Sequence, residues 1–260
     1  MSTLPGDDRF AQPAPGDVDA GPADPLDAGA GRPPLRVVLL DVNGTPSDTS
    51  ALAAVFEGVG APGHLAAPWF AGVLRDGIAL TLHGAAARFA DVAVAGARAV
   101  LAGGGVAAEH LDDAAVAVVD ALGSLPLHPD VVPGLEGLRQ RGLRMVPLSQ
   151  GAAGTTDRLL RSGGAGDLVE GALSVADAPG GLWKPAATTY AWALDQVGAS
   201  PAEAVLVAAH PWDVDGAARA GLATAWVDRS AGTGGATYPA VMAEPDLVVP
   251  GLEALADLLR

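Results

Sequence analysis

The stretch Leu35–Thr45, LRVVLLDVNGT, decides how the rest of the sequence is interpreted. Its run RVVLL is aliphatic and β-branched, which is typical of a strand buried on both faces. The run ends on Asp41, and Asn43, Gly44 and Thr45 follow at once. We therefore expect a central strand that delivers Asp41 to the carboxyl edge of a sheet, where a turn at Gly44 exposes it.

Four later segments have the same apolar character as RVVLL and are bounded by Gly, Pro or Asp. They are 142–149, 204–209, 223–227 and 246–249. Segments with helical periodicity stand between and after them, at 134–142, 155–164, 187–198, 213–221 and 251–260. Strands that alternate with helices predict an α/β fold with a Rossmann-like parallel sheet and helices on both faces.

The stretch between the first and second strands is too long for a single crossover. Residues 50–128 contain several Ala- and Leu-rich periodic segments separated by glycines, and we interpret them as an inserted all-helical cap. The α/β core then comprises residues 35–49 and 129–260. Residues 1–34 carry six Asp and two Arg among many Pro and Gly, a composition that predicts a disordered acidic tail.

Composition narrows the classes of function. The chain has 260 residues and is 50% hydrophobic, and its net charge of −15 argues against binding to nucleic acid or to an anionic membrane surface. It contains no Cys, which excludes a thiolate nucleophile and a disulfide framework. The acidic start MSTLPGDDRF does not resemble a secretory signal, and no apolar run approaches the roughly 18 residues of a membrane span. We expect a cytoplasmic protein.

Ligands of such sheets bind at the carboxyl ends of the strands, near the point where the strand order reverses. The polar and aromatic residues that follow the strands are therefore the candidates for a site, together with a lysine before the helix at 187–198. They are Asp41, Asn43, Thr45, Ser149, Gln150, Lys184, His210, Trp212 and Asp213.

Four short motifs in this set carry a resemblance. DVNGT, PLSQG, WKP and HPWDVDGAARAGL resemble, in order, the four motifs of the haloacid dehalogenase (HAD) superfamily, over the chain from Leu35 to Arg260. The fourth motif is most similar to that of the L-2-haloacid dehalogenase (type II) branch. Tyr190, six residues after Lys184, also fits that branch.

The resemblance implies a hydrolase that works through a covalent ester on Asp41. Lys184 would pair with Asp41 and with a small anionic substrate, while Ser149 and Thr45 would donate hydrogen bonds. Asp213 would orient Lys184 or the hydrolytic water. The non-catalytic alternative for Asp41, Ser149 and Thr45 is a local capping or turn role at the end of a strand.

Two positions separate the branches of the superfamily. Phosphate-transferring members have a second Asp two residues after the nucleophile, where this chain has Asn43, which cannot transfer a proton. They also hold magnesium with an Asp at the position of Ala209. We therefore expect no cofactor, with magnesium only if the protein is a phosphatase after all.

The helical insertion departs from the dehalogenase pattern. The family has Arg directly after a Trp, whereas Trp69 is followed here by Phe70, and Arg75 is the candidate substitute. Gln150 and His210 stand where the family has Asn. For Trp69, Phe70 and Tyr190, core packing and substrate contact remain alternatives. For His210 a structural and a catalytic role are alternatives, and for Arg75 the alternatives are a role at the site and a place on a solvated face.

Three functions follow from these observations. The first is a hydrolase similar to 2-haloacid dehalogenases, acting on a small carboxylic acid. The second is a phosphatase for a small phosphate ester, and the third is a catalytically degraded binding protein that keeps the fold. A homodimer is left open.

Overall fold

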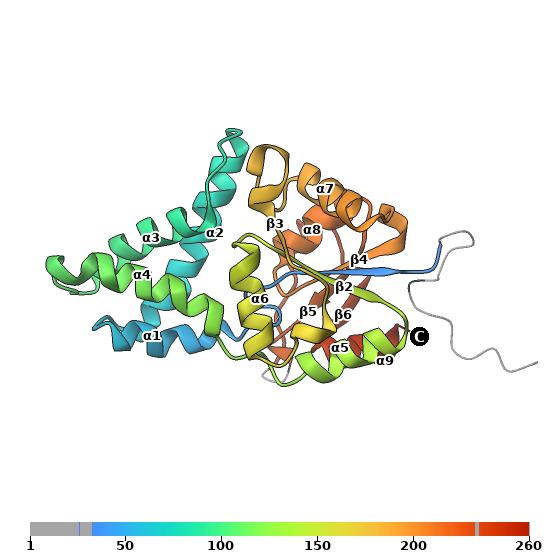
Figure 1. Cartoon of the computed structure of the whole chain (residues 1–260), viewed down its shortest axis with the longest axis horizontal. Coiled ribbons are helices and arrows are strands. Elements are labelled where there is room, and N and C mark those ends of the chain that lie inside the picture. The colour runs from blue at the N-terminus through green and yellow to red at the C-terminus, as the bar shows by residue number, and fades with distance from the viewer. Residues whose placement is uncertain (1–25, 27–32, 232–233, 260) are drawn as a thin grey trace, which may run out of the picture.

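A computed structural model of the chain describes residues 26, 33–231 and 234–259, and it contains a six-stranded parallel sheet (Figure 1). The strand order is β3-β2-β1-β4-β5-β6. The strands are β1 (Val37–Leu40), β2 (Arg144–Ser149), β3 (Leu173–Ser174), β4 (Ala204–Ala208), β5 (Ala223–Val227) and β6 (Leu247–Val249). The α/β fold and the five expected strands are confirmed, and the two-residue edge strand β3 is an addition to them.

β1 occupies the middle of the sheet, with β2 on one side and β4 on the other. Val38 lies beside Met145 of β2 and Val205 of β4, and all three side chains are buried. The chain moves outward from β1 through β2 to β3, and then returns to place β4 next to β1. The carboxyl end of β1 is therefore the point at which the order reverses, and Asp41 is the next residue.

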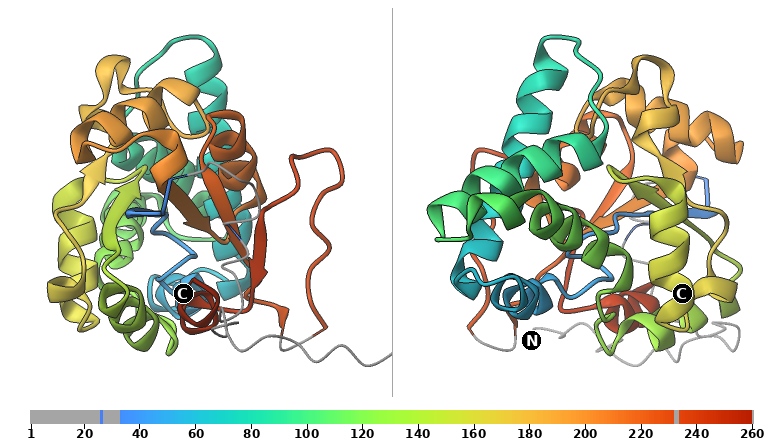
Figure 2. Two further views of the ribbon diagram at one scale, coloured as in Figure 1. Left: turned by 90° about the vertical axis from the view of Figure 1, so that its right-hand side faces the viewer. Right: turned by 60° about the vertical axis from the view of Figure 1, so that its left-hand side comes forward.

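Helices cover both faces of the sheet, because alternate residues of β1 point to opposite faces. Val38 and Leu40 pack with α5 (Val131–Gln140) and α9 (Leu252–Leu258), which lie side by side (Figure 2). Val37 and Leu39 face α7 (Ala187–Val197) and α8 (Pro211–Arg219). Helix α6 (Ala153–Ser162) follows β2.

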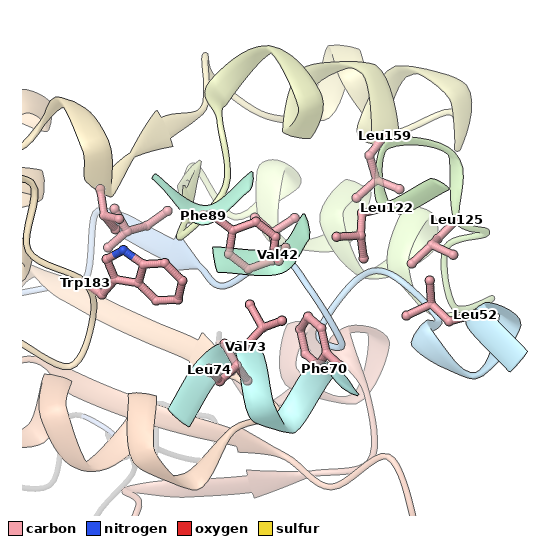
Figure 3. Close-up of a cluster of buried hydrophobic side chains, with 14 of the residues drawn as sticks. Val42, Leu52, Phe70, Val73, Leu74, Phe89, Leu122, Leu125, Leu159 and Trp183 are labelled. Atoms are coloured by element: carbon pink, nitrogen blue, oxygen red, sulfur yellow. The ribbon is translucent and has the colours of Figure 1, made fainter. Parts of the chain in front are cut away.

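Four helices between β1 and β2 lie beyond the carboxyl ends of the strands (Figure 1). They are α1 (Leu52–Gly58), α2 (Ala66–Leu82), α3 (Phe89–Gly103) and α4 (Leu111–Ala121). Figure 3 shows Phe70, Val73 and Leu74 of α2 near Val42, in an apolar cluster that joins this helical segment to the sheet. The segment thus forms a second wall above Asp41.

Two short linkers connect the helical segment to the sheet, and they are paired with each other. The backbone N–H of Asp48 donates to Pro126 at 2.8 Å, and that of His128 donates to Pro46 at 2.9 Å. Ser47 and Leu127 form an antiparallel bridge between them. The segment therefore leaves and rejoins the sheet at a single place.

Two sequence expectations need comment. The expectation that no apolar run reaches the length of a membrane span was wrong by length and composition, because residues Gly63–Leu82 form one helix with a mean hydropathy of 1.2. Trp69, Phe70 and Val73 of this helix are buried in the protein, as in a core helix. The predicted disordered tail, residues 1–34, lies almost entirely outside the described residues.

Candidate active site

Three charged side chains meet at the carboxyl end of β1. The Nζ of Lys184 donates to Oδ1 of Asp41 and to Oδ2 of Asp213, each at 2.7 Å. Lys184 and Asp213 are fully buried, and Asp41 is 4% exposed. They come from the end of β1, from the loop before α7 and from the first turn of α8. The expectation that Lys184 lies beside Asp41 agrees with this geometry.

The environment of Asp41 favours its ionised form. Burial by itself would raise the pKa of Asp41, but the charge of Lys184 and the nearby His210 act in the opposite direction. Hydrogen bonds from Lys184 and Thr45 add to the effect, so the pKa of Asp41 lies below its ordinary value. Asp41 is thus a carboxylate at neutral pH, with a fixed orientation.

Lys184 and Asp213 respond differently to the same burial. Burial lowers the pKa of Lys184, but the charges of Asp213 and Asp41 outweigh it and hold that pKa above its ordinary value. Burial raises the pKa of Asp213, and the charge of Asp41 adds to this rise despite the attraction of Lys184. One carboxylate of the pair is therefore more acidic than usual and the other more basic.

Tyr190 of α7 contacts the carboxylate oxygen of Asp213 that Lys184 does not use. Its hydroxyl donates to Oδ1 of Asp213 at 2.5 Å, so both oxygens of this carboxylate are occupied. Burial and the charge of Asp213 raise the pKa of Tyr190 well above its ordinary value, and the hydroxyl remains a donor. Tyr190 is fully buried, so core packing and a polar contact to the cluster coincide in one side chain.

Thr45 and Gly44 form the turn that follows Asp41. The hydroxyl of Thr45 donates to Oδ2 of Asp41 at 2.8 Å and accepts from the backbone N–H of Ala209 at 2.8 Å. Gly44 has φ of +84°, and a Cβ on it would lie 3.3 Å from Nε2 of His210. Both the positive φ and the close approach of His210 require glycine here.

His210 lies near the same oxygen of Asp41 that Thr45 contacts. Its Nε2 is 2.8 Å from the carbonyl oxygen of Asn43 and 3.8 Å from Oδ2 of Asp41. Because a carbonyl only accepts, Nε2 carries the hydrogen of that bond. The ring stacks on Trp212 and faces Phe70, with ring centroids 5.3 and 6.3 Å apart. The structural and the substrate-facing alternatives for His210 both fit this position.

Ser149 and Gln150 follow β2 and hold the neighbouring loops. The Oγ of Ser149 accepts from the N–H of Gly151 at 3.0 Å, which is a local capping contact. The side chain of Gln150 bonds both backbone groups of Lys184, donating to its oxygen at 2.9 Å and accepting from its nitrogen at 3.1 Å. Gln150 therefore positions the lysine.

Two clefts lie beside this cluster, and their linings include neighbours of Asp41, Lys184 and Asp213 but none of these three residues. The first, of about 380 Å³, is lined by Asn43, Ser149 and Gln150 from the sheet edge and by Phe89 of α3. Two arginines, Arg88 and Arg158, also line it. Sequence reasoning did not single out either arginine, since neither lies in a motif and only the packing of α3 and α6 brings them to one cleft.

The second cleft, of about 680 Å³, lies between α2 and the loop after β4. Phe70, Arg75, His210 and Trp212 line it, together with aliphatic residues of α2. The side chain of Arg75 is 75% exposed and pairs with the adjacent Asp76, as expected for a solvated face, while it also borders the cleft. Phe70 is thus part of the wall of the second cleft.

Trp69 takes the core-packing alternative. It is 1% exposed, and its indole N–H donates to the carbonyl of Ala93 in α3 at 3.1 Å. Its ring packs against Phe56 with centroids 5.7 Å apart. Trp69 therefore holds helices of the segment together and presents the next residue, Phe70, to the second cleft.

The donor set at this edge does not suit magnesium. A hard cation of this kind needs several free oxygen ligands in octahedral geometry. The oxygens of Asp41 and Asp213 are engaged by Lys184, Thr45 and Tyr190, and Ala209 offers no side-chain ligand. In the part of the chain that the structure describes, no group of three or more acidic, His or Cys side chains could hold a metal.

The parallel sheet with an inserted helical segment and the lysine between two carboxylates at its carboxyl edge define an α/β protein with a Rossmann-like core and a buried charged site. The sequence profile of the haloacid dehalogenase-like hydrolases matches residues 35–221, and the chain belongs to this family. The resemblance seen in the four motifs is thereby confirmed.

The similar proteins point to one branch of the family. Haloacetate dehalogenase H-2 of Moraxella sp. (strain B) is 30% identical over 131 residues, which are 50% of this chain and 56% of that protein. The (S)-2-haloacid dehalogenase of Pseudomonas sp. (strain YL) is 29% identical over 141 residues, 54% of this chain and 58% of that one. The chain thus matches little more than half the length of these curated relatives.

The similarity of structure extends further along the chain. The L-2-haloacid dehalogenase from Xanthobacter autotrophicus, solved with chloropropionic acid covalently bound, superposes with a TM-score of 0.75 at 25% identity. The match covers 87% of this chain and 98% of that one. The fold of that enzyme therefore extends over most of this chain.

Proposed function

We propose that this protein hydrolyses a small 2-substituted carboxylic acid, displacing halide or a related leaving group from the carbon next to the carboxylate. The observation that carries the proposal is the lysine held at 2.7 Å from both Asp41 and Asp213, with Asn43 in place of a proton-transferring Asp. An ionised Asp41 is suited to attack carbon. Displacement of a halide at carbon needs no acid to protonate the leaving group, unlike hydrolysis of a phosphate ester.

In the first step an oxygen of Asp41 forms a bond to C2 of the substrate while the bond from C2 to the leaving group breaks, and the leaving group departs with the electron pair. In the second step water attacks the Cγ of the new ester, and the bond between Cγ and the oxygen on C2 breaks. One proton of that water goes to Asp213, whose raised pKa makes it the stronger base of the two carboxylates, once a bond from Lys184 or Tyr190 to Asp213 opens. The other proton goes to the departing alkoxide, and Asp41 is again a carboxylate. The products are a 2-hydroxy acid, the displaced anion and, after return of Asp213 to its ionised form, one proton.

The first cleft supplies the chemistry for the substrate carboxylate. Ser149 lines it with a hydroxyl, and Arg158 lines it with a guanidinium that has no ion pair among the described residues. We assign the carboxylate to this side, and we assign the side chain at C2 to the apolar second cleft near Phe70 and His210. Arg75, mostly solvated and paired with Asp76, then contributes little.

The same proposal covers the domains of the protein, its cofactors, its location and its partners. Residues 50–128 act as a cap that covers the reacting atoms, and residues 35–49 with 129–260 form the catalytic core. No metal or other cofactor takes part. The protein acts in the cytoplasm on a small anionic molecule, without nucleic acid or membrane as a partner, and a homodimer stays a prediction of the sequence.

One experiment separates the alternatives. The protein, in excess over substrate, is mixed with 2-chloropropionate or chloroacetate in oxygen-18 water for a single turnover. The masses of its peptides are then measured by mass spectrometry. Attack of water on the Asp41 ester puts the label into Asp41, whereas direct attack of water on C2 puts it into the product and contradicts the mechanism. A panel of phosphate esters with and without magnesium tests the phosphatase alternative. Lack of reaction with every substrate points to the degraded binding protein.

A further inference from the structure

Arg229 is a part-buried arginine at the end of segment 210–229, which resembles the fourth-motif region, and no role was expected for it from the sequence. It follows β5 by two residues, and its side chain is 18% exposed. Its Nη2 and Nε both donate to the backbone carbonyl of Thr45, at 2.5 and 3.2 Å. Its Nη1 donates to Oδ1 of Asp130 at 2.5 Å. One guanidinium therefore contacts a backbone oxygen and a carboxylate from two distant parts of the chain.

These two contacts fall at the ends of the paired linkers. Thr45 directly precedes the outgoing linker, residues 46–48, and Asp130 follows the returning linker, residues 126–128, by two residues. The other oxygen of Asp130 accepts from the N–H of Leu252 at 2.7 Å, where α9 begins. Asp130 is thus anchored to a helix of the sheet, and Arg229 joins both linkers to that anchor.

Thr45 is the residue through which this arrangement reaches Asp41. Its hydroxyl contacts Asp41 on one side and the N–H of Ala209 on the other, each at 2.8 Å. The turn is also held by bonds from the N–H of Thr45 to the carbonyl of Val42 at 3.3 Å and from the N–H of Gly44 to Oγ of Ser47 at 3.1 Å, but among the described residues the hydrogen bonds to the Thr45 carbonyl come from Arg229. The bidentate grip of Arg229 therefore restrains that carbonyl.

We propose that Arg229 is a positioning residue: it holds the Thr45 peptide so that the hydroxyl stays on Asp41, and it fixes the base of the helical segment relative to the sheet. The effect on turnover rests on the proposed function, whereas the effect on the Thr45 turn does not. Misplacement of a reacting group by about 1 Å costs on the order of 100-fold in rate.

The chain offers a matched control in Arg144. It also grips a carboxylate and a backbone carbonyl, since Nε and Nη2 donate to Glu170 at 2.7 and 2.9 Å and Nη1 donates to Val197 at 2.8 Å. It stands at the amino end of β2, five residues before Ser149, which is roughly 17 Å along a strand. Loss of Arg144 thus removes equivalent bonds away from Asp41.

The test compares Arg229→Ala, Arg229→Lys and Arg144→Ala in the full-length chain. Steady-state kinetics with 2-chloropropionate give kcat and KM, and amide hydrogen exchange by NMR follows the N–H of Ala209. We expect Arg229→Ala to lower kcat roughly 10- to 100-fold with a smaller change in KM, and added guanidinium ion to restore part of the loss. Arg229→Lys falls between, and Arg144→Ala keeps the wild-type kcat.

The exchange measurement keeps this inference separate from the proposed function. If the wild type turns over no haloacid, faster exchange at Ala209 in both Arg229 variants, with wild-type exchange there in Arg144→Ala, supports the positioning role by itself. Wild-type kcat and wild-type exchange in Arg229→Lys and Arg229→Ala would overturn it. An equal loss of kcat in Arg144→Ala would overturn it too, since it would mark a general loss of stability.

Discussion

The two walls of the site differ in how their side chains are held. On the sheet side, Asp41, Lys184 and Asp213 are fixed by short directional bonds, and no buried side-chain N or O atom among the described residues lacks a partner. On the helical side, Phe70, Val73 and Leu74 of α2 are held in an apolar cluster. Directional bonds fix one geometry for the reaction, whereas a packed apolar wall can change shape without disturbing that geometry.

Among the substitutions that test this difference between the two walls, Asp41→Asn should have the largest effect. The amide keeps the shape of the side chain but removes the nucleophile, so we expect turnover to fall by a factor on the order of 10⁴ or more. Asp112→Asn, in an exposed pair with Arg98, is the control and should keep full activity. Initial rates of anion release measure both variants, and full turnover by Asp41→Asn would refute the proposed nucleophile.

The next largest effect is expected from Lys184→Met. Its removal leaves two buried carboxylates without their common partner, which costs about 3–5 kcal/mol of stability. The exposed pair of Arg36 with Glu203 provides the comparison, since Arg36→Met should cost at most about 1 kcal/mol. Urea unfolding followed by circular dichroism gives both values, and equal losses would show that the buried lysine has no special place.

The pH dependence tests the same wall without a mutation. Because the pKa of Asp41 is lowered, Asp41 stays ionised down to below about pH 4, the ordinary pKa of Asp, and the raised pKa of Lys184 keeps the lysine charged to at least about pH 10. Asp213 must be ionised to accept the proton of water and its pKa is raised, so the acid limb of kcat should belong to Asp213 and lie above about pH 4. A pH–rate profile at saturating substrate measures this, and an acid limb below about pH 4 would contradict Asp213 as the base.

The same pKa shifts determine whether the stability of the fold rises or falls with pH. A lowered pKa means that Asp41 contributes stability above about pH 4 and loses it as the pH falls through the lowered value. The raised pKa of Lys184 contributes stability below about pH 10 and is lost as the pH rises beyond the raised value. Asp213 opposes the first trend, because its pKa is raised.

The smallest effect, and the one that sharpens the contrast most, is expected from Phe70→Leu. It enlarges the second cleft, so we expect the ratio of kcat/KM for 2-chlorobutyrate over chloroacetate to rise about tenfold while kcat for chloroacetate stays near wild type. Phe56→Leu is the control, because Phe56 is equally buried in the helical segment but lies outside the lining of both clefts. A large fall in kcat for Phe70→Leu would mean that the helical wall shares in the chemistry.

Much of the fold and of the charged cluster was predictable because both depend on local patterns. The apolar runs gave the positions of β1, β2, β4, β5 and β6, while β3, only two residues long, has no pattern to detect. Asp41 and Asp213 were placed together because residues after parallel strands share one edge of the sheet, and the resemblance of the WKP motif added Lys184, in the loop before α7, to them.

The rest could not be predicted because it depends on where long side chains reach. Arg158 has no motif around it, and Arg229 ends the segment that resembles the fourth-motif region but had no expected role. Only the packing of α6 and of the loop after β5 brings them to the first cleft and to Thr45. The choice of Trp69 for the core and Phe70 for a wall depends on the rotation of α2. Neighbouring residues on a helix point in directions that only tertiary packing settles.

The paired linkers make the helical segment exchangeable. Because Asp48 and Pro126 are joined by a 2.8 Å hydrogen bond, the sheet experiences the whole insertion as one closed loop with a fixed base. Each doubling of a flexible loop adds only about 0.6 kcal/mol of closure entropy, so a folded insertion of another size costs the core little. Chimeras that graft the helices of a related dehalogenase between residues 48 and 126 should therefore fold, and they would transfer substrate preference as a module.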